Sequence, residues 1–261
     1  MCLILLSFQA HPGYRLVVAA NRDEWFRRAA EPARFWSEAP GVLAGRDAAH
    51  GGTWLGVTRN GRFAALTNYR EPQRYDRDAP SRGALVAGFL RGAASARDYT
   101  AELQRTTAHF NGYSLIAYDG DALYCVSNRS AAPQRLVPGI YGLSNHLLNT
   151  PWPKVTRGVA ALTALTARPE PAPELFQVLY DRQPADDAAL PDTGLDLERE
   201  RAVSASHIVF GPANDWTAVY GTRCATVVTL SDGGRVDYEE RTFTPAGLID
   251  SVSAESYRVE R

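Results

Sequence analysis

The residue of this chain best placed for nucleophilic chemistry is Cys2, the second residue of the sequence. Removal of the initiator methionine ahead of such a small residue leaves a cysteine that carries both a thiol and a free α-amine. An α-amine has a pKa of about 7.7–8.0, so much of it is neutral at physiological pH and it can act as a general base without a histidine partner. The alternative is that Cys2 is a small buried residue at the start of a strand, as free cysteines often are.

A polar cluster, Asn21-Arg22-Asp23-Glu24, follows the second apolar run of the chain. If residues 3–8 pair with residues 16–21 in a hairpin, this cluster returns to the sheet edge beside the N-terminus. A cation at that edge lowers the pKa of a thiol, and a carboxylate orients an amine. The alternative interpretation is a turn at a strand end that carries an ion pair.

The two apolar runs that position these residues predict the fold class. Residues 3–8 and 16–20 are nearly continuous apolar segments of strand length, and the His11-Pro12-Gly13 connection is too short for a crossover, so we predict an antiparallel hairpin. Continuous apolar strands are buried on both faces, which places their sheet between a second sheet and a layer of helices. We therefore predict the α+β class, as a four-layer αββα sandwich of two mostly antiparallel sheets.

The remaining pattern supplies further strands and two pairs of helices. Asn60-Gly61 and Gly120-Asp121 are hairpin turn signals, and Ser81 and Ser95 are candidate helix N-caps. We predict strands over residues 54–58, 62–67, 113–119, 122–127, 140–143, 216–220, 223–230 and 235–244. Helices are predicted over residues 81–91, 95–110, 153–167 and 173–182, with loops over 68–80 and 183–197. No repeat or linker divides the chain, so residues 1–261 are expected to form a single domain.

Composition and charge exclude several classes of protein. The chain has 261 residues, of which 45% are hydrophobic and 22% charged, as in a globular protein rather than a disordered or fibrous one. A net charge of -1 argues against a nucleic-acid partner, and we interpret the arginine excess, with Lys154 the only lysine, as coding bias. The three cysteines (Cys2, Cys125 and Cys224) are too few and too scattered for a disulfide framework or a zinc site, so no metal is expected.

No targeting or membrane segment is predicted. The apolar start MCLILLSFQA lacks a basic region and leads into His11, Pro12 and Gly13 rather than a cleavage site. The apolar runs are short of the roughly 18 consecutive residues that a membrane helix needs. We therefore expect a cytoplasmic protein without an integral membrane segment.

Six short strings, spread along nearly the whole chain, carry a resemblance to one family. In order they are MCLILLSF, AANRDEW at 19–25, GGTWLG at 51–56, LTN at 66–68, YGLSN at 141–145 and YGTRCATVV at 220–228. In these six strings taken together, the chain resembles the NRDE family, also called the transport-and-Golgi-organisation protein 2 family. The resemblance implies an αββα fold like that of the N-terminal-nucleophile hydrolases, which agrees with the sandwich predicted from burial.

The resemblance also implies a set of site residues. The bile-salt hydrolase and penicillin acylase group, which is similar in plan, uses an N-terminal cysteine, an Arg and an Asp after the second strand, Asn residues as oxyanion donors and a late Arg. The corresponding catalytic candidates here are Cys2, Arg22, Asp23, Asn68, Asn145 and Arg223.

The spacing of two of these candidates departs from that group. Its Arg and Asp are separated by two residues, whereas Arg22 and Asp23 are adjacent and point to opposite faces of a regular strand, so only one faces Cys2. If the comparison with that group is anchored at Trp25, Asn21 and Glu24 occupy the positions of its Arg and Asp instead. The ligand-binding candidates are therefore Asn21, Glu24, Trp54 and His146.

Two functions of different class are compatible with these residues. In a thiol amidohydrolase, Cys2 attacks an amide or acyl carbonyl, Asn68 and Asn145 stabilise the oxyanion, and no cofactor is required. Taken singly, the two asparagines also fit turn positions after strands. The resemblance implies the alternative, a non-enzymatic carrier of haem, with His146 the first candidate axial ligand, or a protein that handles acyl-CoA or lipid through arginines of the 68–82 segment. In either case the partner is a small molecule.

Overall fold

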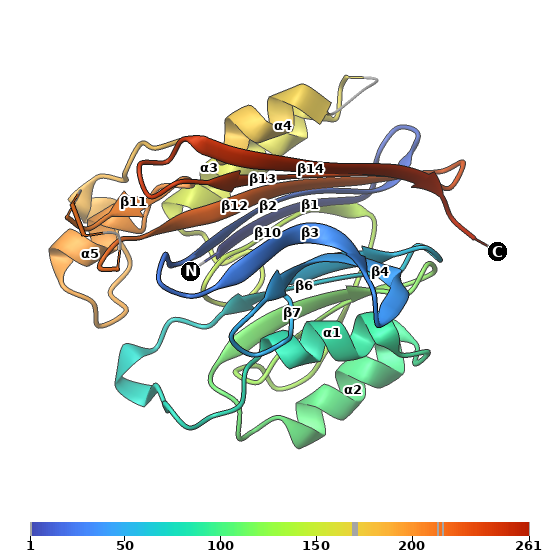
Figure 1. Cartoon of the computed structure of the whole chain (residues 1–261), viewed down its shortest axis with the longest axis horizontal. Coiled ribbons are helices and arrows are strands. Elements are labelled where there is room, and N and C mark those ends of the chain that lie inside the picture. Colours follow the sequence, from blue (N-terminus) through green and yellow to red (C-terminus); the bar gives the residue numbers. More distant parts are fainter. Residues whose placement is uncertain (1, 169–171, 213, 216, 261) are drawn as a thin grey trace.

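In the computed structural model, two antiparallel sheets face each other and helices cover both outer faces (Figure 1). The structure describes residues 2–168, 172–212, 214–215 and 217–260. This arrangement confirms the predicted four-layer αββα sandwich. Within the described residues, no helix is both long enough and apolar enough to cross a membrane.

The first sheet contains the N-terminal hairpin and the C-terminal strands. Its order is β10-β1-β2-β12-β13-β14, with β11 paired to β12. The strands are β1 (Cys2–His11), β2 (Tyr14–Trp25), β10 (Gly139–Leu143), β11 (Val209–Phe210), β12 (Tyr220–Ser231), β13 (Arg235–Phe243) and β14 (Ile249–Arg258).

The second sheet follows the chain order, β3-β4-β5-β6-β7-β8-β9. Its strands are β3 (Ala30–Trp36), β4 (Ala39–Asp47), β5 (Leu55–Thr58), β6 (Phe63–Asn68), β7 (Tyr113–Tyr118), β8 (Leu123–Ser127) and β9 (Gln134–Leu136). Every neighbouring pair in both sheets is antiparallel, including pairs joined by short turns, such as β1 with β2, and pairs distant in the chain, such as β2 with β12.

The helices divide between the two outer faces. α1 (Gly83–Arg91) and α2 (Ala96–Thr106) pack on the second sheet, while α3 (Pro153–Leu165) and α4 (Ala172–Leu179) pack on the first. A short helix, α5 (Leu197–Ala202), and two 3₁₀ turns, η1 (Pro72–Arg74) and η2 (Asp187–Ala189), lie in connecting segments. Ser95 caps α2 as predicted, since its side chain accepts a hydrogen bond from the backbone of Asp98. α1 begins after Arg82 without a side-chain cap, so the prediction that Ser81 caps it is wrong.

The opening hairpin is buried on both faces, as its composition predicted. Ile4 and Leu6 lie in the core between the two sheets, whereas Leu3 and Leu5 lie in the core beneath α3 and α4. Gly158 allows the close approach of α3, because a Cβ there would meet the Leu5 side chain at 2.6 Å. The hairpin therefore packs against the second sheet on one face and against α3 and α4 on the other, and Cys2 is its first residue.

The structure corrects several element predictions. Strands β3, β4, β9, β11 and β14 and helix α5 were not predicted. The predicted strand over 216–220 is wrong over residues 217–219, where the chain turns before β12 begins at Tyr220, and Trp216 lies outside the described residues. Part of the predicted 183–197 loop forms η2.

Candidate functional site

Cys2 begins β1, and its two neighbouring strands supply its surroundings. It pairs with Arg22 on β2, and the Ser144 hydroxyl, just after β10, donates to the Cys2 carbonyl at 2.9 Å. The side chain is 8% exposed and lines a pocket of about 130 Å³. The thiol is thus nearly buried, but a small pocket reaches it.

Burial raises the pKa of the Cys2 thiol and the negative charge of Asp23 raises it further, whereas two interactions oppose these effects. The backbone N–H of Asp23 donates to the sulfur, and the Arg22 guanidinium adds a positive charge, and both lower the pKa. Arg22 is itself buried and packs over the Trp54 ring at 4.2 Å, and its Nη1 has no hydrogen-bond partner among the residues that the structure describes. A buried guanidinium with an unused donor beside a thiol favours the thiolate or an anionic group of a ligand.

The register of the hairpin decides which residue of the polar cluster shares a face with Cys2. Paired residues of antiparallel strands point to the same face, so Arg22 lies on the side of Cys2. Asp23 points to the opposite face, where the Thr222 hydroxyl donates to its carboxylate at 2.7 Å. Burial raises the pKa of Asp23, and the charge of Lys154 lowers it. The departure from the two-residue spacing thus places the cation and the carboxylate on different sides of one strand.

Glu24 and Asn21 have different surroundings. Glu24 lines the Cys2 pocket and forms an ion pair with Arg28 at 3.9 Å. Asn21 points towards the helical layer, and its amide donates to the carbonyls of Leu179 and Ser206, each at 2.8 Å. Both amide hydrogens of Asn21, a predicted ligand-binding residue, therefore hold together segments of the protein itself.

Asn68 and Asn145 lie at the ends of β6 and β10 and are brought together. The Asn145 amide donates to the Asn68 carbonyl at 2.9 Å, and the Arg70 backbone N–H donates to the Asn145 carbonyl at 2.8 Å. Asn145 is buried, whereas Asn68 is half-buried and lines both the Cys2 pocket and a larger cleft. Asn68 therefore offers a side-chain amide within the space that Cys2 reaches.

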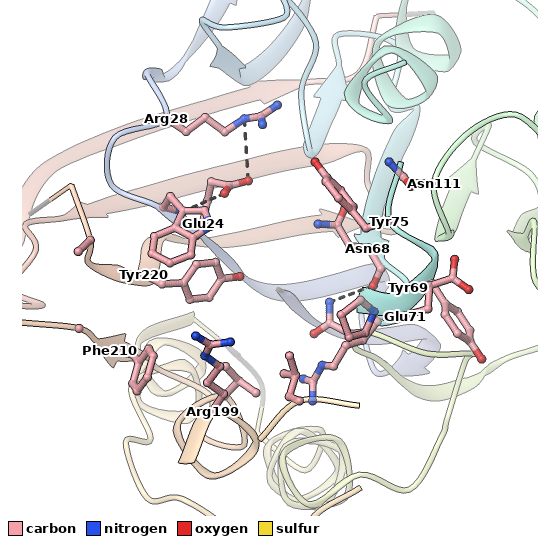
Figure 2. Close-up of a pocket in the computed structure, with 18 of the residues that line it drawn as sticks. Glu24, Arg28, Asn68, Tyr69, Glu71, Tyr75, Asn111, Arg199, Phe210 and Tyr220 are labelled. Carbon is pink, nitrogen blue, oxygen red and sulfur yellow. Dashed lines mark hydrogen bonds and ion pairs between the residues drawn. The ribbon is translucent and has the colours of Figure 1, made fainter. Parts of the chain in front are cut away.

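The larger cleft has a volume of about 1610 Å³ and a lining rich in aromatic and arginine side chains. Figure 2 shows Phe210 and Tyr220 on one side and Asn68, Tyr75 and Asn111 on the other. The cleft and the Cys2 pocket adjoin, because the same seven residues line both: Glu24, Arg28, Asn68, Tyr75, Arg77, Arg82 and Asn111. The arginine-rich segment after β6, predicted as a loop, thus forms a wall of the cleft.

Like Asn21, two more predicted site residues line neither space. Arg223 donates to the carbonyls of Trp25 and Arg28 at 3.1 and 2.8 Å, so it holds the turn after β2 rather than facing Cys2. His146 contacts the Tyr69 hydroxyl through Nε2 at 2.6 Å and the Thr150 hydroxyl through Nδ1 at 2.8 Å. Both nitrogens of the first candidate axial ligand are therefore occupied by the protein.

Lys154 is a buried charged residue that the sequence analysis did not single out. The only lysine of the chain is 1% exposed, stands in the first turn of α3, and interacts electrostatically with Asp23 and Cys2. Beside it, Arg70 and Glu200 form a buried ion pair at 2.6 Å, and Arg70 packs over Trp152. The clue was the rarity of lysine itself, which was interpreted as coding bias. In the described part of the chain, no cluster of three His, Cys, Asp or Glu side chains is arranged to hold a metal ion.

Two antiparallel sheets packed face to face with helices on both outer faces define the class of this protein, an N-terminal-nucleophile-hydrolase-like fold. A solved structure of the same class is the Caenorhabditis elegans ortholog of N-acylethanolamine-hydrolyzing acid amidase, which matches with a TM-score of 0.52 and 11% sequence identity. The match covers 87% of this chain and 92% of that one. At this identity the likeness concerns the fold alone.

The family follows from sequence comparison. The model of the Transport and Golgi organisation 2 family matches residues 1–245. The Bos taurus Transport and Golgi organization protein 2 homolog is 36% identical over 93% of both chains, and the Homo sapiens homolog is 35% identical over 95% of both. The chain belongs to this family, as the resemblance of its short motifs implied.

Proposed function

We propose that this protein is an N-terminal-nucleophile hydrolase in which the Cys2 thiolate cleaves a non-peptide amide or acyl bond. One observation carries the proposal. The Cys2 thiol, at the start of β1, lies in a pocket that adjoins a large cleft, beside a buried guanidinium whose Nη1 has no partner in the described part of the chain. A cysteine that only fills the core would need neither a neighbouring arginine nor a pocket that reaches its thiol.

The side chains around Cys2 support the chemistry of acyl transfer. The thiolate, stabilised by Arg22 and the Asp23 N–H, attacks the carbonyl carbon, forming a C–S bond and an oxyanion. The Asn68 amide faces this space and would donate to the oxyanion. Where Met1 has been removed, the α-amine of Cys2 takes the thiol proton and returns it to the leaving amine. Water then breaks the thioester and regenerates the thiol.

The size of the cleft favours a substrate with a substantial acyl or leaving group. A volume of about 1610 Å³ exceeds the roughly 300–1,000 Å³ of ordinary small-molecule pockets. Aromatic side chains offer apolar contact area, and arginines offer donors for anionic groups. The lining therefore supports an extended substrate that carries a negative charge.

The proposal is tested with a chain-length series of fluorogenic N-acyl amides and acyl thioesters. We expect turnover, and an acyl adduct on the Cys2 peptide by mass spectrometry after rapid acid quench. Cys2→Ala should lower turnover by at least about 10³-fold, since loss of a covalent nucleophile has effects of that order or larger. Cys125→Ala is the control, because Cys125 is a buried core thiol whose pKa is raised to about 12. Activity that survives Cys2→Ala, or no adduct with any member of the series, would exclude the proposal.

The same cleft favours a second candidate, the binding of a large anionic cargo such as haem or an acyl-CoA without chemistry at Cys2. Its support is the size of the cleft and the arginines that line it, among them Arg28, Arg77 and Arg82. Because both His146 ring nitrogens are occupied, haem ligation by His146 requires those hydrogen bonds to break. A saturable Soret shift at micromolar haem that is lost in His146→Ala or Cys2→Ala would favour this candidate, and no shift would exclude haem.

A further inference from the structure

The strand order leaves β10 and β14 at the edges of the first sheet and β3 and β9 at the edges of the second. Three of these edges carry features that hinder pairing with another chain. β3 contains Pro32 and the charged Glu31 and Arg34, and β9 has only three residues. The free side of β10 is covered by Asn149, whose backbone N–H donates to the Gly142 carbonyl at 2.7 Å and whose side-chain oxygen accepts from the Gly142 N–H at 2.9 Å. These three edges are therefore poor templates for a further strand.

β14, the long red strand that ends the first sheet in Figure 1, lacks such protection. It runs for 10 residues, Ile249–Arg258, without proline or lysine. Most of its residues are exposed, and Ile249 and Val252 expose 52% and 55% of their surface. Its register shift lies beside Ile249, so its pairing with β13 is regular from Ser251 to Arg258. A long, exposed and regular edge strand is a template for pairing with another strand.

The backbone of β14 presents donors and acceptors along this edge. The Ser251 N–H donates to the Thr242 hydroxyl at 3.1 Å, and the Val259 N–H donates to the Gly234 carbonyl at 2.8 Å. The N–H groups at odd-numbered positions therefore point towards β13, and those at the even-numbered positions of 252–258 point away, because the direction alternates along a strand. Within the described residues, no backbone hydrogen bond covers these even-numbered positions on the free side.

The sequence of β14 complements itself when two such strands run antiparallel. With Ala254 opposite Ala254 of a second copy, the outward-pointing Val252 and Ser256 pair with each other, and Asp250 lies opposite Arg258 at both ends. We propose that two copies of this chain associate through β14 in this register, so that their first sheets join into one continuous sheet. Because each copy contributes the same surface, the association closes at two copies.

Charges on and beside β14 favour a second copy as the occupant and select this register. Arg258 lies opposite Arg235 of β13, and Asp250 of the second copy supplies a carboxylate beside these two like charges. Shifting the pairing by two residues in one direction places Glu255 against Glu255 of the second copy, which is unfavourable. A shift in the other direction places Leu248, which precedes the strand, opposite Arg258 and loses the ion pair.

The interface is independent of chemistry at Cys2, so it is tested without a substrate. Analytical ultracentrifugation of the full chain over a wide range of concentrations should show a reversible equilibrium between one and two copies. A chain that stays monomeric at the highest concentration would overturn the proposal. Continued growth beyond two copies would also overturn it, because the proposed pairing uses up the free edge of both strands.

Charge exchange tests the register. Asp250→Arg and Arg258→Asp should each weaken dimerisation by at least about tenfold, because either change places two pairs of like charges in the dimer. A mixture of the two variants should form a mixed dimer, and the double variant should regain the wild-type association. Glu102→Arg, an equal charge reversal at an exposed position of α2, is the control and should leave the association unchanged. Single variants that associate like the wild type, or a natively folded double variant that stays monomeric, would refute the register.

A proline variant tests the backbone pairing. Ala254→Pro removes an N–H that points away from β13, so pairing within the chain is kept while the ladder between copies loses its central donors. We expect a folded monomer, whereas Ala254→Val, which keeps the N–H, is the matched control and should dimerise. Dimerisation that survives Ala254→Pro would contradict the proposed interface. Should this variant fail to fold, the charge variants still decide the question.

Discussion

Replacing Gly45 by alanine is expected to disturb the wall of the Cys2 pocket. Gly45 lies in β4 against the ring of Trp54, and an alanine Cβ at this position would lie 2.5 Å from Trp54 Cη2. Carbon atoms in contact prefer about 3.5–4.0 Å, so the ring must move. Trp54 in turn covers Arg22, the cation beside Cys2. The substitution therefore tests the link between sheet packing and the site.

The magnitude follows from the contacts that are lost. Overpacking a well-packed site costs about 1–3 kcal/mol, and loss of the cation–π contact between Arg22 and Trp54 adds about 0.5–2 kcal/mol. Gly41→Ala is the matched control, because Gly41 lies in the same strand and an alanine Cβ there would have no atom within 4 Å. Both variants share the unfolded-state effect of replacing glycine, so their difference isolates the clash. We expect Gly45→Ala to be about 2–4 kcal/mol less stable than Gly41→Ala.

Urea denaturation of both variants and the wild type measures this difference, and the alkylation rate of Cys2 reports on the pocket. The double variant Gly45→Ala with Trp54→Leu removes the clashing ring atoms, so the two substitutions should be strongly non-additive. A difference below about 0.5 kcal/mol between the two glycine variants, or additivity in the double variant, would refute the reasoning from this contact.

Three further predictions concern stability and are measured by chemical denaturation. Arg70→Met leaves the buried Glu200 without its arginine partner and should lower the free energy of unfolding by about 3–5 kcal/mol. Adding Glu200→Gln should restore much of this loss. Equal losses in the single and the double variant would count against an ion-pair effect. Burial lowers the pKa of His207 to about 4, so its contribution to stability is complete above about pH 6.5 and is lost as pH falls towards 4. From pH 7 to 4.5 the wild type should lose about 2 kcal/mol more than His207→Leu, and parallel pH curves would contradict this. Ser95→Ala removes the cap of α2 and should cost about 1 kcal/mol, whereas no change would mean that the cap is not stabilising.

The strands that the sequence predicted and those that it missed differ in how they are stabilised. β1 and β2 are continuous apolar runs, which have few alternatives to burial in a sheet covered on both faces. β14 is mostly exposed, and its strand conformation depends on pairing with β13 from Arg235 to Phe243. β3 contains Pro32 and two charged residues, Glu31 and Arg34, and it pairs with β4. Edge strands of this kind carry weak local patterns, because backbone pairing supplies much of their stability.

The candidate site shows the same division. The hairpin predicted from residues 3–8 and 16–21 correctly returned the polar cluster to the N-terminus, because a short turn forces antiparallel pairing. The alternation rule correctly required Arg22 and Asp23 to face opposite sides. Which of them shares a face with Cys2 depends on register, and one residue of slippage would exchange the two.

The sequence by itself determined the layered architecture, the N-terminal hairpin and the candidate nucleophile, because burial demand and short turns act locally along the chain. Only the tertiary structure decided the surroundings of Cys2. Lys154 on α3, Arg70 after β6 and Glu200 on α5 meet behind β1 and β2 although they are distant in the chain. The pKa values of buried groups depend on such neighbours and on the loss of water, and neither can be read from local pattern. For the same reason, a lone lysine in an arginine-rich sequence became meaningful only when the fold enclosed it.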